Sequence, residues 1–360
     1  MAKKQKKLVR PHSKQADAAT ALDYRPPRPR QYRPHIGVIG CGGIVETHLE
    51  AYRKARYRVV AFADPILDRA RQRRDQFYRR ADVYDSAEEL LARPDIEVVD
   101  IATHPEARVT LIERAIRAGK HVLSQKPFVT DPAVGKRLVA MAKRKRVKLA
   151  VNQNGRWAPH VSYARQTIAN GLLGEVSSVD LSVHWDHNWC AGTPFDRVRH
   201  LALFDFGIHW FDMVHCYMGN QKARTVFAAT CRTRNQRARP PLLAQAVIQF
   251  ARGQATLVFR GDTQQGPRDR TVIVGSLGTL ISSGPDLNSQ TVTLYADGAT
   301  VTPRLRTHWF PDGFDGTMSE LLCAIEEDRE PSNSARDNLH SLALCFAAMR
   351  SADTGQVESV

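Results

Sequence analysis

Three side chains of this 360-residue chain are suited to proton transfer, namely Lys126, Asp205 and His209. If residues 205–218 form a helix, Asp205 and His209 stand at positions i and i+4 and share one face. The carboxylate can then accept a hydrogen bond from the imidazole, fix its tautomer and support its charged form during acid–base catalysis. A polar pair that merely caps the start of a buried helix is the structural alternative.

Lys126 lies two residues after the predicted strand 121–124 and precedes Pro127. Proline restricts the residue before it to an extended conformation, which fixes the direction in which the lysine side chain leaves the backbone. In an open parallel sheet, ligands bind outside the carboxyl ends of the strands. The position of Lys126 therefore predicts a side chain that points into a ligand site, although a surface lysine is the commoner case.

A glycine-rich turn comes directly after the apolar run 35–39, and a helical pattern follows it. Only glycine lets the backbone approach a diphosphate closely, and a helix N-terminus presents free N–H groups to that anion. Asp64 lies 22 residues after Gly42, where an acid would bind the adenosine ribose. The pattern predicts a dinucleotide site rather than an ordinary strand–turn–helix junction. Its residues are Gly40, Gly42, Gly43, Ile44 and Asp64.

The segment 184–190, HWDHNWC, contains enough ligand types to raise the question of a metal. If the segment continues a strand, His184 and His187 point to opposite faces of the sheet and do not share an ion. No metal is therefore predicted. A polar rim around a sugar is favoured, in which His187 lines the substrate and Trp185 or Trp189 offers a stacking face.

The net charge of +15 raises the possibility of nucleic-acid binding, but its distribution argues against a specific nucleic-acid partner. Residues 1–34 contain ten Lys/Arg and two Asp, so +8 comes from this segment alone. It is predicted to be a disordered basic arm. Neither a long apolar run nor a secretory signal is present, so no membrane association is expected. The six cysteines lack C-x-x-C spacing, which favours free thiols and a cytoplasmic location.

Strand and helix patterns alternate over residues 35–152, which predicts an α/β Rossmann domain with a doubly wound parallel sheet. Several alternating strands separated by turns follow between residues 224 and 301, and helical patterns at 314–328 and 335–352 close the chain. This order predicts an α+β domain over residues 153–360 with a large, mainly antiparallel open sheet.

Five segments together resemble the Gfo/Idh/MocA family, the relatives of glucose–fructose oxidoreductase and inositol dehydrogenase, between residues 34 and 355. They are GVIGCGGI at 37–44, ADP at 63–65, IAT at 101–103, AGKHVLSQKP at 118–127 and DFGIHWFD at 205–212. The resemblance implies that the first domain binds NAD or NADP and that the second binds a carbohydrate or polyol. It also implies a homodimer or homotetramer formed through the back of the second sheet.

The resemblance assigns individual roles. Lys126 is expected to contact the reacting hydroxyl and the nicotinamide region, and His209 to be the acid–base group with Asp205 as its partner. NAD is favoured over NADP because the Asp64 carboxylate would repel a 2′-phosphate, although Arg69 and Arg71 lie nearby in sequence. The remaining residues expected at the cofactor or the substrate are Thr103, Gln125, Asn154, Arg156 and Trp157.

Four positions depart from the family pattern. Gln125 stands where a Glu usually precedes Lys-Pro, and Arg108 replaces a common His. Val45 takes the third glycine position of G-x-G-x-x-G, and the segment before Asp205 is RVRHLALF rather than glycine-rich. Gln125 removes a negative neighbour from Lys126. The segment RVRHLALF indicates an unusual substrate preference.

Three functions are compatible with these residues. The leading one is an NAD(P)-dependent dehydrogenase that acts on a secondary alcohol of a sugar, sugar derivative or polyol. The alternatives are a glycoside-cleaving enzyme, which uses a retained NAD in a cycle of oxidation, elimination and reduction, and a non-catalytic cofactor-responsive regulator. The presence of both Lys126 and His209 disfavours the regulator.

Overall fold

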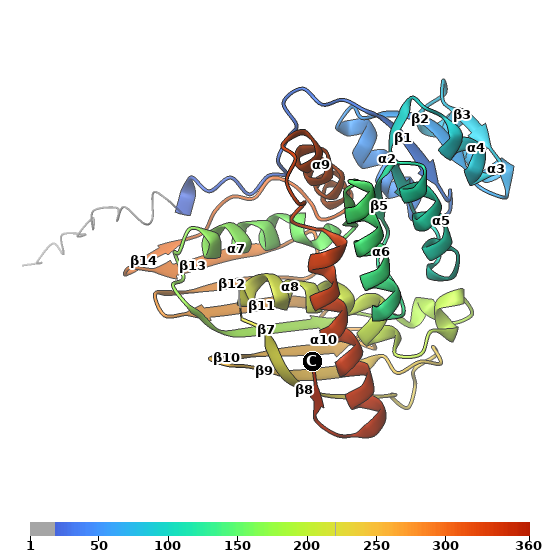
Figure 1. The fold of residues 1–360 in the computed structure, drawn as a ribbon. Helices are drawn as coiled ribbons and strands as arrows, with labels where there is room; N and C mark the ends of the chain where they lie inside the picture. The colour runs from blue at the N-terminus through green and yellow to red at the C-terminus, as the bar shows by residue number, and fades with distance from the viewer. Residues whose placement is uncertain (1–18, 220) are drawn as a thin grey trace, which may run out of the picture.

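The computed structural model describes residues 19–219 and 221–360. Its first half is built on a parallel sheet with the strand order β3-β2-β1-β4-β5-β6. Helices lie on both faces of this sheet (Figure 1), so its strands are apolar almost throughout. The strands are β1 (His35–Ile39), β2 (Arg58–Ala63), β3 (Asp82–Tyr84), β4 (Ile96–Ile101), β5 (His121–Ser124) and β6 (Leu149–Val151), and the helices are α2 (Val45–Lys54), α3 (Leu67–Phe77), α4 (Ala87–Ala92), α5 (Pro105–Arg117) and α6 (Pro132–Lys145).

The second half is built on a sheet with the strand order β14-β13-β12-β11-β7-β10-β9-β8-β15. All neighbouring strands in it are antiparallel except β7 and β10. The strands are β7 (Val176–His184), β8 (Ala223–Cys231), β9 (Leu243–Phe250), β10 (Gly253–Arg260), β11 (Arg268–Gly275), β12 (Gly278–Gly284), β13 (Thr291–Ala296), β14 (Ala299–Val301) and β15 (Glu358–Ser359). The predicted fold class, a Rossmann domain followed by a mainly antiparallel open sheet, is confirmed.

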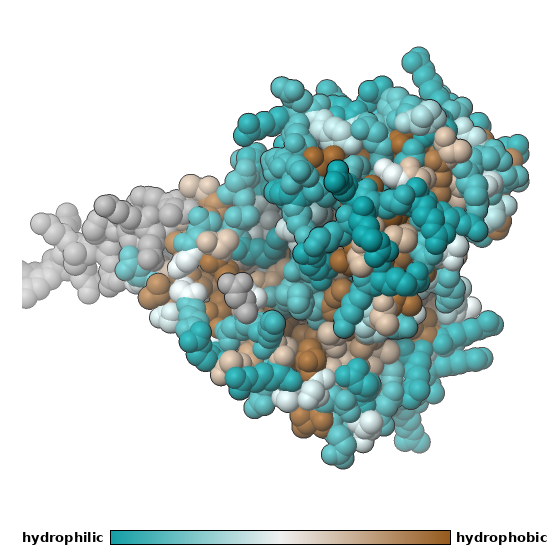
Figure 2. Space-filling model, viewed as in Figure 1, coloured by the Kyte–Doolittle hydropathy of each residue, from teal (hydrophilic) through white to brown (hydrophobic). Residues whose placement is uncertain are grey.

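One face of the large sheet is covered by α7 (Pro159–Ala169), α8 (Ile208–Met218) and α10 (Ala335–Thr354), which cross it in Figure 1. Strand β9 shows the consequence, since its residues are alternately buried and exposed. The other face leaves Phe227, Val247 and Tyr295 exposed by 41–48%. Figure 2 shows the helix-covered side of the molecule, which is largely hydrophilic with apolar residues among the hydrophilic ones. Within the described residues, no helix is long and apolar enough to cross a membrane.

Helix α9 (Asp312–Glu326) belongs to the second half of the chain but packs against the first. Its Phe314, Met318 and Leu321 share one hydrophobic core with Val45 and Leu49 of α2. These side chains are all buried. The helix therefore ties the Rossmann domain to the chain that follows the large sheet, and the expected domain boundary at residue 152 does not separate two independent cores.

Residues 19–34 correct the prediction of a disordered arm for the part of it that is described. The Arg28 guanidinium forms two hydrogen bonds to the Asp315 carboxylate, 2.7 and 2.6 Å long. The Glu326 carboxylate accepts three backbone N–H groups, from residues 30, 31 and 32, at 2.6–2.7 Å. Arg28 thus pairs with one acid of α9 and the backbone at residues 30–32 docks on another, while residues 1–18 lie outside the described residues.

The predicted helix over residues 205–218 is also corrected. A π-helical segment (Ala202–Phe206) contains Asp205, and α8 begins only at Ile208. A π-helix has more residues per turn than an α-helix, so the i, i+4 relation no longer places two side chains on one face. Asp205 and His209 therefore do not form the predicted pair.

The docking of the N-terminal segment gives a first prediction. Because one carboxylate accepts all three N–H groups, Glu326→Ala should release the backbone at residues 30–32. Hydrogen exchange of these amides, followed by mass spectrometry, should become at least about tenfold faster while the core strands stay protected. Glu327→Ala is the matched control, since Glu327 pairs only with Arg329 in the described structure. Equal exchange in both variants would contradict the proposed docking.

Candidate active site

The glycine turn after β1 leaves open space at the carboxyl edge of the parallel sheet. Gly40 has a φ of +89°, and a Cβ there would lie 2.7 Å from Thr103 Cγ2. A Cβ on Gly42 or Gly43 would meet no atom within 4 Å. The neighbouring Ile44 is 41% exposed. The turn thus needs glycine at position 40 for its backbone and keeps a free approach at positions 42 and 43, which fits a bound diphosphate.

Thr103 lies beside this turn, as expected for a residue that lines the cofactor. Its Oγ1 is buried and has no hydrogen-bond partner among the described residues. A buried hydroxyl without a partner is costly, and a bound ligand that supplies one removes this cost. The orphaned Thr103 hydroxyl and the open glycines together fit the predicted dinucleotide.

Asp64 is fixed at the end of β2. Its carboxylate accepts the Cys41 N–H at 2.8 Å and the Ile66 N–H at 2.9 Å, and the residue is 5% exposed. The sequence placed Arg69 and Arg71 near Asp64, but Arg71 pairs with Asp68 at the surface. Arg73 instead reaches back from α3 and donates to the Gly42 carbonyl oxygen at 3.3 Å.

Lys126 follows β5 and joins the two halves of the chain. Its Nζ donates to the Asp205 carbonyl oxygen at 2.8 Å and lies 3.4 Å from Asp205 Oδ2. An ammonium has three N–H donors, so one has no partner among the described residues. Both side chains are 18% exposed, so this ion pair is only partly solvated. The Asp205 carboxylate therefore orients Lys126 rather than the imidazole of His209.

Gln125 has a role different from the expected one, because a buried network uses its amide. Its Oε1 accepts the Lys126 N–H at 2.7 Å, so its Nε2 faces His48 Nε2 at 3.0 Å. Asn152 also donates to this nitrogen, at 3.1 Å. His48 Nε2 is therefore an acceptor, and its Nδ1–H donates to Asp100 at 2.7 Å. Gln125 positions the backbone of Lys126 instead of pointing towards the cofactor.

His209 is buried on the first turn of α8. Burial lowers the pKa of its imidazole well below 6.5, and the positive charge of Lys126 lowers it further. Its Nδ1 has no hydrogen-bond partner in the described part of the chain. The ring is therefore neutral near pH 7 and can accept a proton from a ligand.

Asn154 and a residue that sequence reasoning missed, Trp309, form the wall beside His209. The Trp309 Nε1–H donates to Asn154 Oδ1 at 2.6 Å. The indole meets the His209 ring edge-on, with 5.6 Å between the ring centroids. Trp309 follows a segment without regular structure, so no periodic pattern could have identified it.

Arg156 and Trp157 do not line this site. The Arg156 guanidinium forms two 2.7 Å hydrogen bonds to Asp212, both side chains being at most 3% exposed, and also pairs with Asp337. Trp157 packs so closely on α9 that a Cβ on Gly316 would lie 2.2 Å from it. Both residues therefore hold the helices together, and the predicted substrate role fails because their side chains are occupied.

His187 lies in an aromatic cluster next to the π-helical segment. It stacks on Phe206 with 4.4 Å between centroids and meets Trp185 edge-on at 5.4 Å. Trp189, 52% exposed, lies at the outer side of this cluster. Strand β7 ends at His184, and these histidines form no candidate metal group within the described residues.

Arg108, which replaces the common His, connects two loops at the carboxyl edge of the parallel sheet. Its guanidinium donates to the carbonyl oxygens of Pro127 and Thr103. Burial lowers the pKa of Arg108 to about 10, and the charge of Asp205 opposes this shift. Arg108 thus fixes the loop of Lys126 relative to the loop of Thr103.

Comparisons with known proteins agree with this geometry. Residues 35–153 match a family model described as the oxidoreductase family with an NAD-binding Rossmann fold, and residues 161–281 match the GFO/IDH/MocA C-terminal domain. A D-apiose dehydrogenase of Paraburkholderia graminis is 26% identical over 89% of this chain and 88% of its own. An inositol 2-dehydrogenase of Rhizobium meliloti is 27% identical over 88% of this chain and 96% of its own.

The fold is shared with solved structures. An oxidoreductase from Agrobacterium radiobacter, solved in complex with NAD⁺, L-tartaric acid and magnesium, has a TM-score of 0.81 at 22% identity, over 91% of this chain and 98% of its own. Because two models of one family match the two domains in the same order, the chain belongs to the GFO/IDH/MocA family of NAD-binding oxidoreductases.

Proposed function

We propose that this chain is a dehydrogenase that oxidises a secondary alcohol of a sugar, sugar derivative or polyol. The hydrogen bond between Lys126 and Asp205 supports this proposal. It brings the end of β5 to the start of α8, where His209 lies. The relatives named D-apiose dehydrogenase and inositol 2-dehydrogenase support the same substrate class.

In the proposed reaction, neutral His209 accepts the proton of the substrate hydroxyl. The remaining N–H of Lys126 donates to the same oxygen and stabilises its developing negative charge. Asp205 holds the ammonium in place, and Asn154 and Trp309 fix the wall beside the imidazole. Bound NAD⁺ supplies the hydride acceptor. His187 and Trp189 offer the sugar a polar atom and a stacking face at the rim.

NAD is the proposed cofactor, in preference to NADP. Asp64 is buried and tied to two backbone N–H groups, so it cannot turn away from a ribose that binds beside it. A 2′-phosphate would meet its negative charge.

We further propose a homodimer or homotetramer that covers the open face of the large sheet, where Phe227, Val247 and Tyr295 are exposed. A cytoplasmic location is proposed on the six cysteines, which are all free thiols.

The proposed function is tested by mixing the purified protein with NAD⁺ and panels of inositols, aldoses, uronates and glycosides while nicotinamide absorbance is recorded. NADH should accumulate with one class of polyol or sugar. Lys126→Met should lower kcat at least about 100-fold, because the transition-state oxyanion loses its donor, while NAD⁺ binding stays intact. Lys145→Met, on the exposed face of α6, is the matched control. A cleaved glycoside without NADH would instead establish the cycle of oxidation, elimination and reduction.

The buried His209 predicts an unusual pH dependence. The neutral ring is the base, and its lowered pKa keeps it neutral until the pH falls well below 6.5. The acid limb of kcat/KM for alcohol oxidation should therefore have its midpoint below pH 6.5, with activity lost only as the pH falls through that value. His209→Asn should abolish this limb together with most of the activity. A midpoint above pH 6.5 would contradict a neutral buried His209 as the base.

Cofactor preference gives a further prediction. Asp64→Asn keeps the side-chain shape but removes the charge, so the ratio of the NADP and NAD dissociation constants should fall by about tenfold. Titration of the protein fluorescence with each cofactor measures both constants. Asp68→Asn, a change at an exposed acid of α3, is the control. An unchanged ratio would show that Asp64 does not face the ribose.

A further inference from the structure

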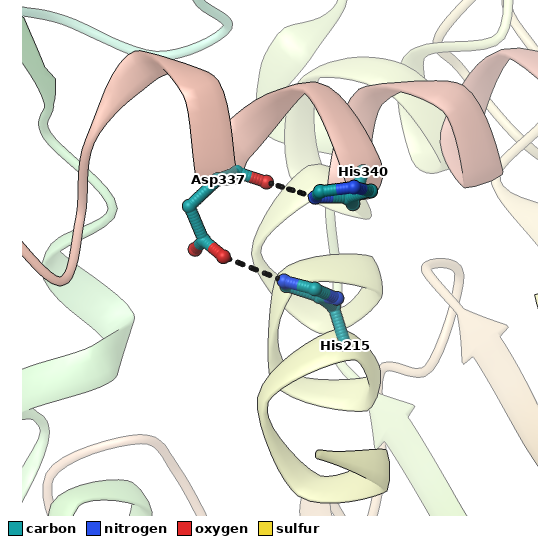
Figure 3. Close-up of side chains that lie close together, drawn as sticks. All are labelled: His215, Asp337 and His340. Atoms are coloured by element: carbon teal, nitrogen blue, oxygen red, sulfur yellow. Dashed lines mark hydrogen bonds and ion pairs between the residues drawn. The ribbon is translucent and has the colours of Figure 1, made fainter. Parts of the chain in front are cut away.

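A second group of titratable side chains lies on the helical layer of the C-terminal domain. It consists of His215 on α8 and of Asp337 and His340 on α10, shown in Figure 3. One ligand atom from each lies within 4.8 Å of the others. Asp337 and His340 are at positions i and i+3, so they lie on the same face of α10.

The contacts inside the cluster are polar and well directed. His215 Nε2 lies 2.9 Å from Asp337 Oδ1, and His340 Nδ1 lies 3.2 Å from the Asp337 carbonyl oxygen. The two imidazoles stack with 5.2 Å between centroids and 22° between planes. In Figure 3 both rings turn a nitrogen towards Asp337. His340 Nδ1 faces a backbone carbonyl oxygen, so a shared ion requires a torsional change in His340, whose side chain is exposed.

The charges around the cluster are mixed. The Arg156 guanidinium is paired with two carboxylates, Asp212 and Asp337, while Arg165 and Lys222 also line the cavity beside the cluster. Asp337 Oδ1 is turned towards His215, while Asp337 Oδ2 accepts a hydrogen bond from Arg156.

The cluster opens into a cavity of about 670 Å³, which all three residues line. None of Lys126, Asp205 and His209 lines this cavity, so it is separate from the proposed active site. The cavity gives an ion access from solvent and leaves room for water in the coordination positions that the protein does not fill.

We propose that His215, Asp337 and His340 bind one Zn²⁺ ion and thereby cross-link α8 to α10. Two imidazole nitrogens and one carboxylate oxygen form a ligand set that Zn²⁺ accepts, with water as the fourth ligand. Arg156 holds the ligating carboxylate from behind, as outer partners of metal ligands commonly do. The proposal of this zinc site stands independently of the proposed dehydrogenase function.

Calorimetric titration of the untagged full-length protein with Zn²⁺ tests the proposal at pH 7.5. One equivalent should bind, and the melting temperature should rise with the zinc concentration, because the ion binds only the folded arrangement. His340→Ala should weaken the binding at least about tenfold and remove the thermal shift, and so should His215→Asn. His35→Ala is the matched control, since His35 forms a pair with Asp95 that lacks a third ligand.

Binding of Co²⁺ in place of Zn²⁺ gives a direct spectroscopic readout, since visible absorption bands should appear and be absent in His340→Ala. NAD⁺ binding by each variant shows that it has folded. The proposal is overturned if Zn²⁺ binds the wild-type protein without saturation, or if both folded variants bind it as tightly as the wild type. Either result would mean that the cluster is a hydrogen-bonded clamp between α8 and α10.

Discussion

The hydrogen bonds of His48 hold together the part of the Rossmann domain on which the proposed active site depends. The imidazole is fully buried and connects α2 with three strand ends, through Asp100, Gln125 and Asn152. Asn152 in turn accepts the Thr317 hydroxyl of α9 at 3.0 Å. Each bond of this buried network restricts the direction of the next, although Asp100 Oδ1 has no partner among the described residues. The hydrogen bond from the Lys126 N–H to Gln125 Oε1 then fixes the backbone of Lys126.

The two halves of the chain are coupled at this same edge. Lys126 crosses to Asp205, while α9 crosses in the opposite direction and buries Phe314 and Met318 in the Rossmann core. The side chains of the second half that are proposed to bind substrate are therefore positioned relative to the glycine turn of the first half by packing. The partly exposed ion pair between Lys126 and Asp205 adds direction rather than much stability.

Local patterns were sufficient to predict the strands of the parallel sheet, the glycine turn after β1, and the positions of Asp64 and Lys126 just after strand ends. Each of these features depends on neighbours in sequence. They could not predict the partners of Arg156, which lie 56 and 181 residues away in sequence. The docking of residues 28–32 on α9 and the contact of Trp309 with His209 could not be predicted for the same reason, because they join residues far apart in sequence. The π-helical turn at Asp205 is a different case, since no propensity distinguishes one extra residue in an apolar helical stretch.

The departure at position 125 follows from the network itself. With glutamine there, the side-chain N–H₂ donates to His48 Nε2, and His48 Nδ1 faces Asp100 at hydrogen-bond distance. An ionised glutamate would offer only acceptors, whereas the glutamine amide offers a donor to His48 and an acceptor to the Lys126 N–H. The nearest carboxylate that orients Lys126 is then Asp205, on the far side of the site, and the lysine is held towards the substrate domain.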